Sequence, residues 1–267
     1  MKKLIYEPAL SIFAAMKLHS CSSTGKDKLK SLLNKLHPVS CDKGLIRLGP
    51  MSDGGYLIPD DLEGIEACFS PGVGFNSIFE KDCANRGMKV FLADKSVDKP
   101  KQSHEYFVFT KKHIGIMNND SFMTIDDWVE SSLPDSKSDL LLQMDIEGSE
   151  YEVLLVASDD ILQRFRIIVV EFHSLNELCR RSFFILASRV FEKLLQTHTC
   201  VHNHPNNFSD LVKFKGLEIP TVMELTFLRN DRVSSPSFAK IFPHPLDADN
   251  TGDYPSLPLP KCWYKGK

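Results

Sequence analysis

The amino-acid sequence predicts an α/β protein with a Rossmann-like, doubly wound, mostly parallel sheet of seven strands. Two observations lead to this class. Apolar strand-like runs alternate with helical runs through the middle of the chain, which is the order that parallel strands joined by crossover helices require. A turn with two glycines follows the first strand-like run, as at the ligand-binding end of doubly wound folds. The length of 267 residues suits one such domain with terminal additions.

Residues 1–48 are expected to form a helical extension before the sheet. Between Asp27 and Leu36 four leucines recur at helical spacing, and Pro38 closes the segment. The first fifty residues carry nine basic side chains against three acidic ones, which is typical of a solvated helix face; an anionic partner or surface is the alternative. The apolar stretch Met1–Cys21 is interrupted by a charged residue and a proline, and it is too short for a transmembrane span.

Composition excludes several classes of protein. The net charge of -3 argues against a protein that coats nucleic acid. Seven cysteines form no C-x-x-C pair, so neither a zinc knuckle nor a disulfide framework is indicated. Reduced thiols in the cytoplasm are therefore expected. Composition leaves the oligomeric state open.

The sheet is expected within residues 49–231. The strand-like runs are Ile65 to Ser70, Lys89 to Ala93, Tyr106 to Thr110, Asp139 to Met144, Ile167 to Phe172, Thr199 to His202 and Val222 to Leu228. Beyond Arg232, six prolines and scattered polar residues cannot sustain a helix or a central strand. Residues 232–267 are therefore expected to form an extended or partly disordered tail.

The turn after the first strand has the features of a cofactor cradle. Gly72 and Gly74 permit a tight turn and close approach of a ligand to the backbone, and Asn76 follows them. Ser77 stands three residues before a glutamate, which is capping-box spacing for a helix start. Asp94 ends the next strand, about twenty residues downstream, where a carboxylate binds ribose hydroxyls in this fold. An ordinary turn and a solvent-exposed aspartate are the alternative.

The turn also discriminates between cofactors. A dinucleotide-binding G-x-G-x-x-G motif would require glycine at position 77, where this sequence has serine. An enzyme whose cofactor carries no phosphate is therefore the first interpretation, and a nicotinamide-dependent oxidoreductase is the second.

The most specific motif comes after the fourth strand. Asp145-Ile146-Glu147-Gly148-Ser149-Glu150, with Val153 and Leu154 after it, resembles the D-[IV]-E-G-x-E-x-x-[VL]-L signature of FkbM-family methyltransferases. Asp53-Gly54-Gly55-Tyr56 resembles the D-G-G-Y element before the cofactor strand in these proteins. Met123–Trp128 and Val170–His173 resemble the segments before the signature and at the end of the fifth strand. The resemblance covers residues 49–229.

This resemblance implies a class I methyltransferase, whose sheet has seven strands, with S-adenosylmethionine (SAM) as cofactor. It implies methyl transfer to the oxygen of a hydroxylated small molecule or glycan. In this class the region after the third strand meets adenine, which implicates Asp120 and Ser121; ordinary turn residues are the alternative. Asp53 is expected at the cofactor, in a lid through which Tyr56 contacts it; a surface turn is the alternative.

Two positions depart from the resemblance. Ser70 stands where many class I methyltransferases begin the glycine motif with an acidic residue, and Gln143 replaces a lysine common before the signature. A non-catalytic binding module that retains the fold is therefore the alternative to an enzyme.

Candidate reactive side chains follow successive predicted strands: Asp145 after the fourth, Glu171 and His173 after the fifth, and His202 and His204 after the sixth. Strand ends converge at one edge of a parallel sheet. Transfer to a hydroxyl requires alignment and a route for its proton. We expect Asp145 or His173 to be the acceptor base, with His204 as a further candidate. Glu147, Glu171 and His204 are expected at the substrate.

The same ligands suit a divalent metal ion, which orients and acidifies a hydroxyl in some O-methyltransferases. His202 and His204 would lie on the same side of an extended strand, as a metal pair does. Such histidines more often pack or form hydrogen bonds in a loop. SAM is therefore the expected cofactor, and no metal ligand is assigned.

Overall fold

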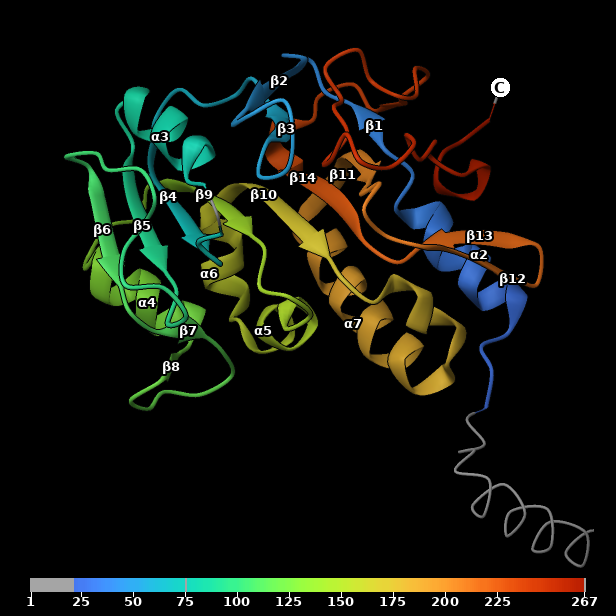
Figure 1. Ribbon diagram of the computed structural model, residues 1–267, viewed down its shortest axis with the longest axis horizontal. Helices are drawn as coiled ribbons and strands as arrows, with labels where there is room; N and C mark the ends of the chain where they lie inside the picture. The colour runs from blue at the N-terminus through green and yellow to red at the C-terminus, as the bar shows by residue number, and fades with distance from the viewer. Residues whose placement is uncertain (1–21, 75, 267) are drawn as a thin grey trace, which may run out of the picture.

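A computed structural model describes residues 22–74 and 76–266 and confirms the predicted α/β class (Figure 1). One seven-stranded sheet has the order β11-β14-β10-β9-β4-β5-β6. Its strands, in chain order, are β4 (Ile65–Pro71), β5 (Lys89–Ala93), β6 (Phe107–Thr110), β9 (Asp139–Met144), β10 (Phe165–Phe172), β11 (His198–Pro205) and β14 (Met223–Arg229). All seven predicted strands are present; the largest change is in β11, which extends to Pro205.

The strand order reverses at the centre of the sheet. From β4 the chain adds β5 and β6 on one side, then crosses to add β9 and β10 on the other. β14 is antiparallel to both β10 and β11, and the other neighbouring pairs are parallel. The chain connections therefore run to opposite sides of the sheet from the neighbouring strands β4 and β9. A crevice forms at the carboxyl ends of these two strands.

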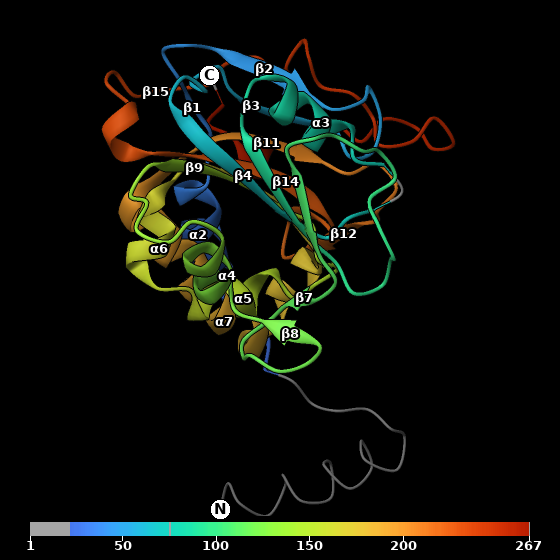
Figure 2. The same cartoon turned by 90° about the vertical axis from the view of Figure 1, so that its left-hand side faces the viewer.

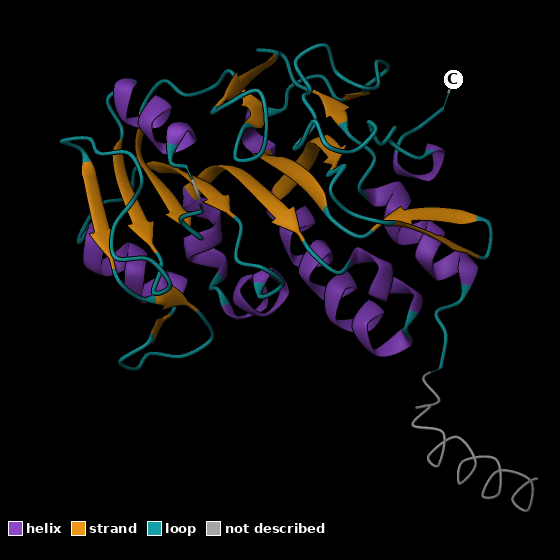
Figure 3. Ribbon diagram, viewed as in Figure 1, coloured by secondary structure: helices purple, strands orange, loops and turns teal. Residues whose placement is uncertain are grey.

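Most helices cover one face of the sheet (Figures 2 and 3). They are α2 (Lys26–Lys35), α4 (Ile125–Ser132), α5 (Glu150–Val156), α6 (Asp159–Arg164) and α7 (Arg181–Thr197). α2 corresponds to the helix predicted from the leucine spacing, and its leucines are buried in the same core as the helices that follow. Trp128 of α4 is buried with its ring edge-on to Phe69, at 4.9 Å between centroids.

The opposite face is covered by α3 (Ile78–Asn85) and by the hairpin of β2 (Leu45–Leu48) and β3 (Tyr56–Pro59). Side chains of these elements form a second core with the strand residues that lie on this face of the sheet. Alternating sides of the strands thus supply two cores, which explains why the strand sequences are apolar almost throughout.

The remaining elements are short: β1 (Val39–Ser40), β7 (His113–Ile114), β8 (Phe122–Met123), β12 (Leu211–Phe214), β13 (Leu217–Pro220), β15 (Ser237–Phe238) and the 3₁₀ turns η1 (Leu175–Cys179), η2 (Asn230–Arg232) and η3 (Lys261–Trp263). The tail is mostly irregular, as its prolines predict, but it is anchored. β15 pairs with β1, and Trp263 is 0% exposed beside α2.

The predictions for the beginning of the chain are only partly covered by the structure. Residues 1–21, with the apolar stretch and three of the basic side chains, lie outside the described residues. Within the described part, no helix has both the length and the apolar character needed to cross a membrane.

Candidate functional site

A cavity of about 490 Å³ opens at the carboxyl ends of β4, β5 and β9, where the strand order reverses. This volume lies within the range of about 300–1,000 Å³ typical of small-molecule sites. Its described lining comprises Gly72, Val73, Gly74, Ala93, Asp94, Ser96, Val97, His113, Ile114, Phe122, Asp145, Ile146, Glu147 and Ser149. The lining includes three carboxylates and, among the described residues, no lysine or arginine.

The two glycines of the turn have different roles. Gly72 has a φ of +89°, and a Cβ there would lie 1.5 Å from the carbonyl oxygen of Asp145. Its amide donates to the Ala93 carbonyl, so it joins the ends of three strands. Gly74 would meet nothing within 4 Å if it carried a Cβ, and it borders the cavity. Gly72 therefore permits close packing of the chain, whereas Gly74 leaves room for a ligand.

Asp94 lies at the cavity wall, where the sequence places it. One carboxylate oxygen accepts the amide of Val73 at 3.0 Å, and the other accepts the amide and hydroxyl of Ser96, both at 2.7 Å. The side chain thus holds the glycine turn to the end of β5. Each carboxylate oxygen has two lone pairs, so Asp94 keeps acceptor capacity toward the cavity.

His113 and Phe122 belong to the part of the lining that sequence analysis missed. They come from the paired strands β7 and β8, and their rings lie 5.5 Å apart. Asp120 and Ser121 precede Phe122 and do not line the cavity; the Ser121 hydroxyl instead accepts a hydrogen bond from Lys95. Strands of two residues carry too short a pattern to be read from the sequence.

The Asp53–Tyr56 segment is part of the scaffold rather than of the described lining. The Asp53 carbonyl accepts the side-chain amide of Asn76 at 3.2 Å, and its carboxylate accepts that of Asn250 at 3.3 Å. Asn76 also accepts the amide of Ile78 at the start of α3. Tyr56 is 2% exposed and packs edge-on against a phenylalanine of α3, outside the described lining of the cavity.

Glu150 organises the loop of the signature. Its Oε1 accepts the amides of Ile146 and Gly148 at 3.2 and 2.9 Å. The backbone of this loop has positive φ at two residues, 56° at Glu147 and 107° at Gly148. The capping box predicted at Ser77 is wrong: Ser77 precedes α3, but its side chain forms no capping hydrogen bond. Ser149 likewise precedes α5 without a side-chain cap. Glu150 satisfies amides of the loop instead.

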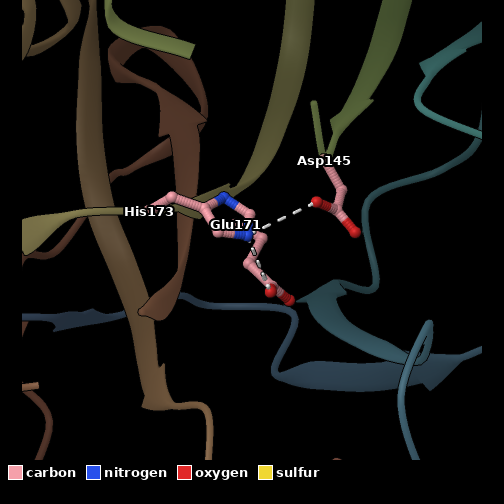
Figure 4. Close-up of side chains that lie close together, drawn as sticks. All are labelled: Asp145, Glu171 and His173. Carbon is pink, nitrogen blue, oxygen red and sulfur yellow. Dashed lines mark ion pairs between the residues drawn. The ribbon is translucent and has the colours of Figure 1, made fainter. Parts of the chain in front are cut away.

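Asp145, Glu171 and His173 converge beside the cavity from the ends of β9 and β10 (Figure 4). The Nε2 atom of His173 lies 3.6 Å from Glu171 Oε1, 4.0 Å from Asp145 Oδ1 and 3.4 Å from Glu147 Oε2. Its Nδ1 atom faces Glu150 Oε1 at 3.2 Å. The structure thus brings together four predicted site residues and adds Glu150.

This crowding of negative charge affects the pKa of each group. Burial raises the pKa of Asp145 to about 7, with the charge of His173 opposing and those of Glu147 and Glu150 adding to the effect. Burial and Asp145 raise the pKa of Glu171 well above its ordinary value. Burial lowers the pKa of His173, but the hydrogen bond and charge of Glu150, with Asp145 and Glu147, outweigh it, and the pKa is raised.

The two departures from the family pattern contact each other below the cavity. The Ser70 hydroxyl lies 2.6 Å from Gln143 Oε1 and 2.6 Å from Glu80 Oε1. All three side chains are buried, and burial raises the pKa of Glu80. α3 thus supplies a carboxyl group at the position where serine replaces the usual acidic residue.

His204 lies away from this cluster. His202 Nε2 and His204 Nδ1 face the two oxygens of Asp247 at 2.9 and 3.4 Å. The hydrogen bond and charge of Asp247, with the charge of Glu224, raise the pKa of His204 against the effect of its burial. The predicted pairing of the two histidines on one side of β11 is present, and its partner is a carboxylate of the tail.

Comparison with known proteins identifies one family. The profile of the methyltransferase FkbM domain matches residues 59–193, just over half of the chain. No curated protein matches the chain. A solved structure with similarity is a putative methyltransferase from an antibiotic biosynthesis pathway of Anabaena variabilis, with 11% identity and a TM-score of 0.28 over 53% of this chain and 60% of that one. The chain thus spans less than two thirds of that structure.

Another is a mutant of the 16S rRNA (adenine(1408)-N(1))-methyltransferase from Catenulisporales acidiphilia. It has 11% identity and a TM-score of 0.30, over 72% of this chain and 99% of that one.

Proposed function

Because the chain belongs to the FkbM family of methyltransferases, we propose that it transfers a methyl group from SAM to a hydroxyl oxygen of a small molecule or glycan. The observation that carries the choice of cofactor is the charge of the cavity. Three carboxylates and no described lysine or arginine line it. Such a wall attracts a cofactor with a positive sulfonium and repels the pyrophosphate of a dinucleotide.

The lining also fits the parts of SAM. Asp94 has acceptor capacity for ribose hydroxyls, and the open side of Gly74 allows the ligand to approach the backbone. His113 and Phe122 offer ring surfaces for adenine at the far wall. Asp145 lies between this cradle and the Glu171 and His173 pair, which gives the cofactor and the acceptor adjoining places.

Bound SAM supplies a methyl group on a positively charged sulfur. The protein must then align the acceptor and remove its proton. We assign Asp145 and His173 to this task, because their nitrogen and oxygen atoms face one another beside the cavity, with Glu150 holding the ring. Glu147 and Glu171 border the same space and would contact the acceptor.

Cofactor binding tests this proposal directly. Calorimetric titration with S-adenosylhomocysteine is expected to show one site per chain. Asp94→Asn keeps the shape but removes the charge that binds hydroxyls, so affinity should fall by about 10-fold or more, since a hydrogen bond to a charged group contributes about 1.5–3 kcal/mol. Asp98→Asn is the matched control, because this carboxylate is exposed and outside the described lining.

Two outcomes would contradict the proposal. Folded protein that binds NADH and not S-adenosylhomocysteine would make it an oxidoreductase. Binding of S-adenosylhomocysteine with equal affinity in both aspartate variants and the wild type would place the cofactor elsewhere. Transfer to oxygen is tested by incubation with methyl-labelled SAM and panels of hydroxylated compounds and glycans, with the position of the label read by mass spectrometry.

A further inference from the structure

We propose that Asp145, Glu171 and His173 bind a divalent cation of the Mn²⁺ or Zn²⁺ type. These three side chains are the group in the described part of the chain whose ligand atoms all lie within 4.8 Å of one another. Figure 4 shows the two carboxylates turned toward the imidazole from different strand ends.

The distances in the cluster suit a shared ion better than direct hydrogen bonds. His173 Nε2 is 3.6 Å from Glu171 Oε1 and 4.0 Å from Asp145 Oδ1, both too long for a hydrogen bond. Ligands about 2.1 Å from one ion lie about 3.4 Å apart in tetrahedral geometry and about 4.2 Å apart when opposite one another. The observed separations therefore leave the space of one cation between the three groups.

Buried oxygens in the cluster lack partners. Neither Asp145 Oδ1 nor Glu171 Oε2 has a hydrogen bond, although both atoms are buried. The Glu171 side chain is only 6% exposed. A buried carboxylate oxygen without a donor is costly, and a cation would satisfy both.

The groups that would orient the ligands of a metal ion are already in place. A metal-binding histidine usually donates its other ring N–H to a carboxylate. Here Glu150 Oε1 faces His173 Nδ1 at 3.2 Å and is itself held by two backbone amides. This contact favours the tautomer with the hydrogen on Nδ1, in which the lone pair of Nε2 would face Asp145 and Glu171. Glu171 Oε1 is likewise oriented by the side-chain amide of Asn206 at 3.2 Å.

Charge and ligand type define the ion. Asp145, Glu147, Glu150 and Glu171 all face His173, which carries at most one positive charge, so negative charge is in excess among these described residues. Carboxylate oxygens suit Mn²⁺ and Mg²⁺, whereas imidazole suits Zn²⁺ and other transition metals. The mixed set of two carboxylates and one imidazole therefore favours Mn²⁺ or Zn²⁺ over Mg²⁺ or Ca²⁺.

The ion would deepen the proposed function, on which this role rests. It would coordinate the acceptor oxygen and lower the pKa of the hydroxyl. With the ion bound, Asp145 and His173 would hold it instead of acting as the base, and the acceptor proton would leave to Glu147, which is 85% exposed and can pass it to water. The oxygen then bonds to the methyl carbon as the carbon–sulfur bond breaks, giving a methyl ether and a neutral thioether, while the ion keeps its charge.

Mn²⁺ binding to the full chain tests the site. Protein stripped with EDTA is titrated with Mn²⁺, and free Mn²⁺ is followed by electron paramagnetic resonance. We expect one ion per chain, and at least 10-fold weaker binding in Glu171→Gln. Glu224→Gln is the matched control: it removes an equally buried carboxylate directly opposite Glu171 in the neighbouring strand, outside the three ligands, and should change affinity less than 3-fold.

Thermal unfolding provides a second measurement on the same proteins. Without metal, Glu171→Gln should be at least as stable as the wild type, because it removes a buried charge from a repulsive cluster. Mn²⁺ or Zn²⁺ should then raise the midpoint of the wild type and of Glu224→Gln, but not that of Glu171→Gln.

Several results would overturn the site. Equal Mn²⁺ and Zn²⁺ binding by the wild type and Glu171→Gln would do so, as would absence of binding by all three proteins or equal losses in both variants. Titration of metal-free protein with S-adenosylhomocysteine separates this proposal from the preceding one: cofactor binding without metal binding rejects the ion alone, and metal binding without cofactor binding rejects the cofactor alone.

Discussion

Gly72 shows how one residue determines the shape of the candidate site. Its backbone lies against the carbonyl of Asp145, so the glycine turn and the signature loop pack with no side chain between them. Only glycine adopts a φ near +89° without strain and leaves that space empty. The position of Asp145 beside the cavity therefore depends on a glycine more than seventy residues earlier.

Substitution of Gly72 should mainly lower stability, whereas substitution of Gly74 should mainly weaken ligand binding. Gly72→Ala is expected to lower the free energy of unfolding by about 2 kcal/mol or more, from overpacking and from the positive φ. Gly74→Ala, with no atom within 4 Å of the new Cβ, should unfold within about 1 kcal/mol of the wild type but bind S-adenosylhomocysteine more weakly. Urea unfolding and calorimetry measure the two effects. Similar stability of both variants would contradict the assigned roles.

The sequence identifies these residues but not all their roles. Strand-end positions can be read from apolar runs, so Asp94, Asp145, Glu171 and His173 could be placed at one edge before their distances were known. Glu150 could not be recognised, because an acidic residue at a helix start is explained by the helix dipole and says nothing of a hydrogen bond to an imidazole twenty-three residues away. His113 and Phe122 were missed because their strands are too short to carry a pattern.

At the scale of elements, the contact of α3 with β4 and β9 involves Ser70 and Gln143, the two residues that depart from the family pattern. Ser70 has one hydroxyl hydrogen but lies 2.6 Å from oxygens of both Glu80 and Gln143. A protonated Glu80 provides the second hydrogen, and its raised pKa favours that state. Ser70 and Gln143 therefore belong to one hydrogen-bonded unit with a helix, behind the cavity wall. Their presence is explained by packing and does not require loss of function.

This unit predicts a pH dependence of stability. The folded pKa of Glu80 is raised above its unfolded value, so its contribution is complete below the unfolded pKa of about 4.3 and is lost as pH rises through the folded pKa. Glu80→Gln carries no proton to lose. The variant should therefore gain stability relative to the wild type as pH rises from 4.5 to 7.

Urea unfolding across that pH range measures the difference, with Glu130→Gln as a control on an exposed glutamate of α4. The control should follow the wild type at every pH. A constant difference between Glu80→Gln and the wild type would show that the carboxyl group does not titrate in this way.

At the scale of the whole molecule, the sheet was predictable and the arrangement of the ends was not. Seven apolar runs with helical runs between them determine strand number and, with the right-handed crossover preference, much of the topology. The ends of the chain carry no comparable pattern. Their places depend on distant contacts such as β1 with β15, which join residues about two hundred positions apart.

The tail also completes the interior. Asp247 pairs with two buried histidines of β11, and the Asn250 side chain donates to Glu224 at 3.1 Å. Trp263 lies in the same core as the leucines of α2, and its indole donates to the Glu218 carbonyl at 3.2 Å. The segments on either side of residues 49–231 thus pack on each other and on the sheet.

Trp263 is therefore expected to stabilise the whole chain although it lies far from the cavity. Trp263→Ala should lower the free energy of unfolding by about 3–5 kcal/mol, because it removes a fully buried indole and leaves a cavity between α2 and β13. Tyr254→Ala, at a half-exposed residue of the same tail, should cost less than about 1 kcal/mol. Urea unfolding of both variants measures the difference. If Trp263→Ala has the same free energy of unfolding as Tyr254→Ala, the tail does not contribute to the core. If Trp263→Ala lowers stability but leaves the affinity for S-adenosylhomocysteine unchanged at low temperature, the tail supports the fold without shaping the cofactor site.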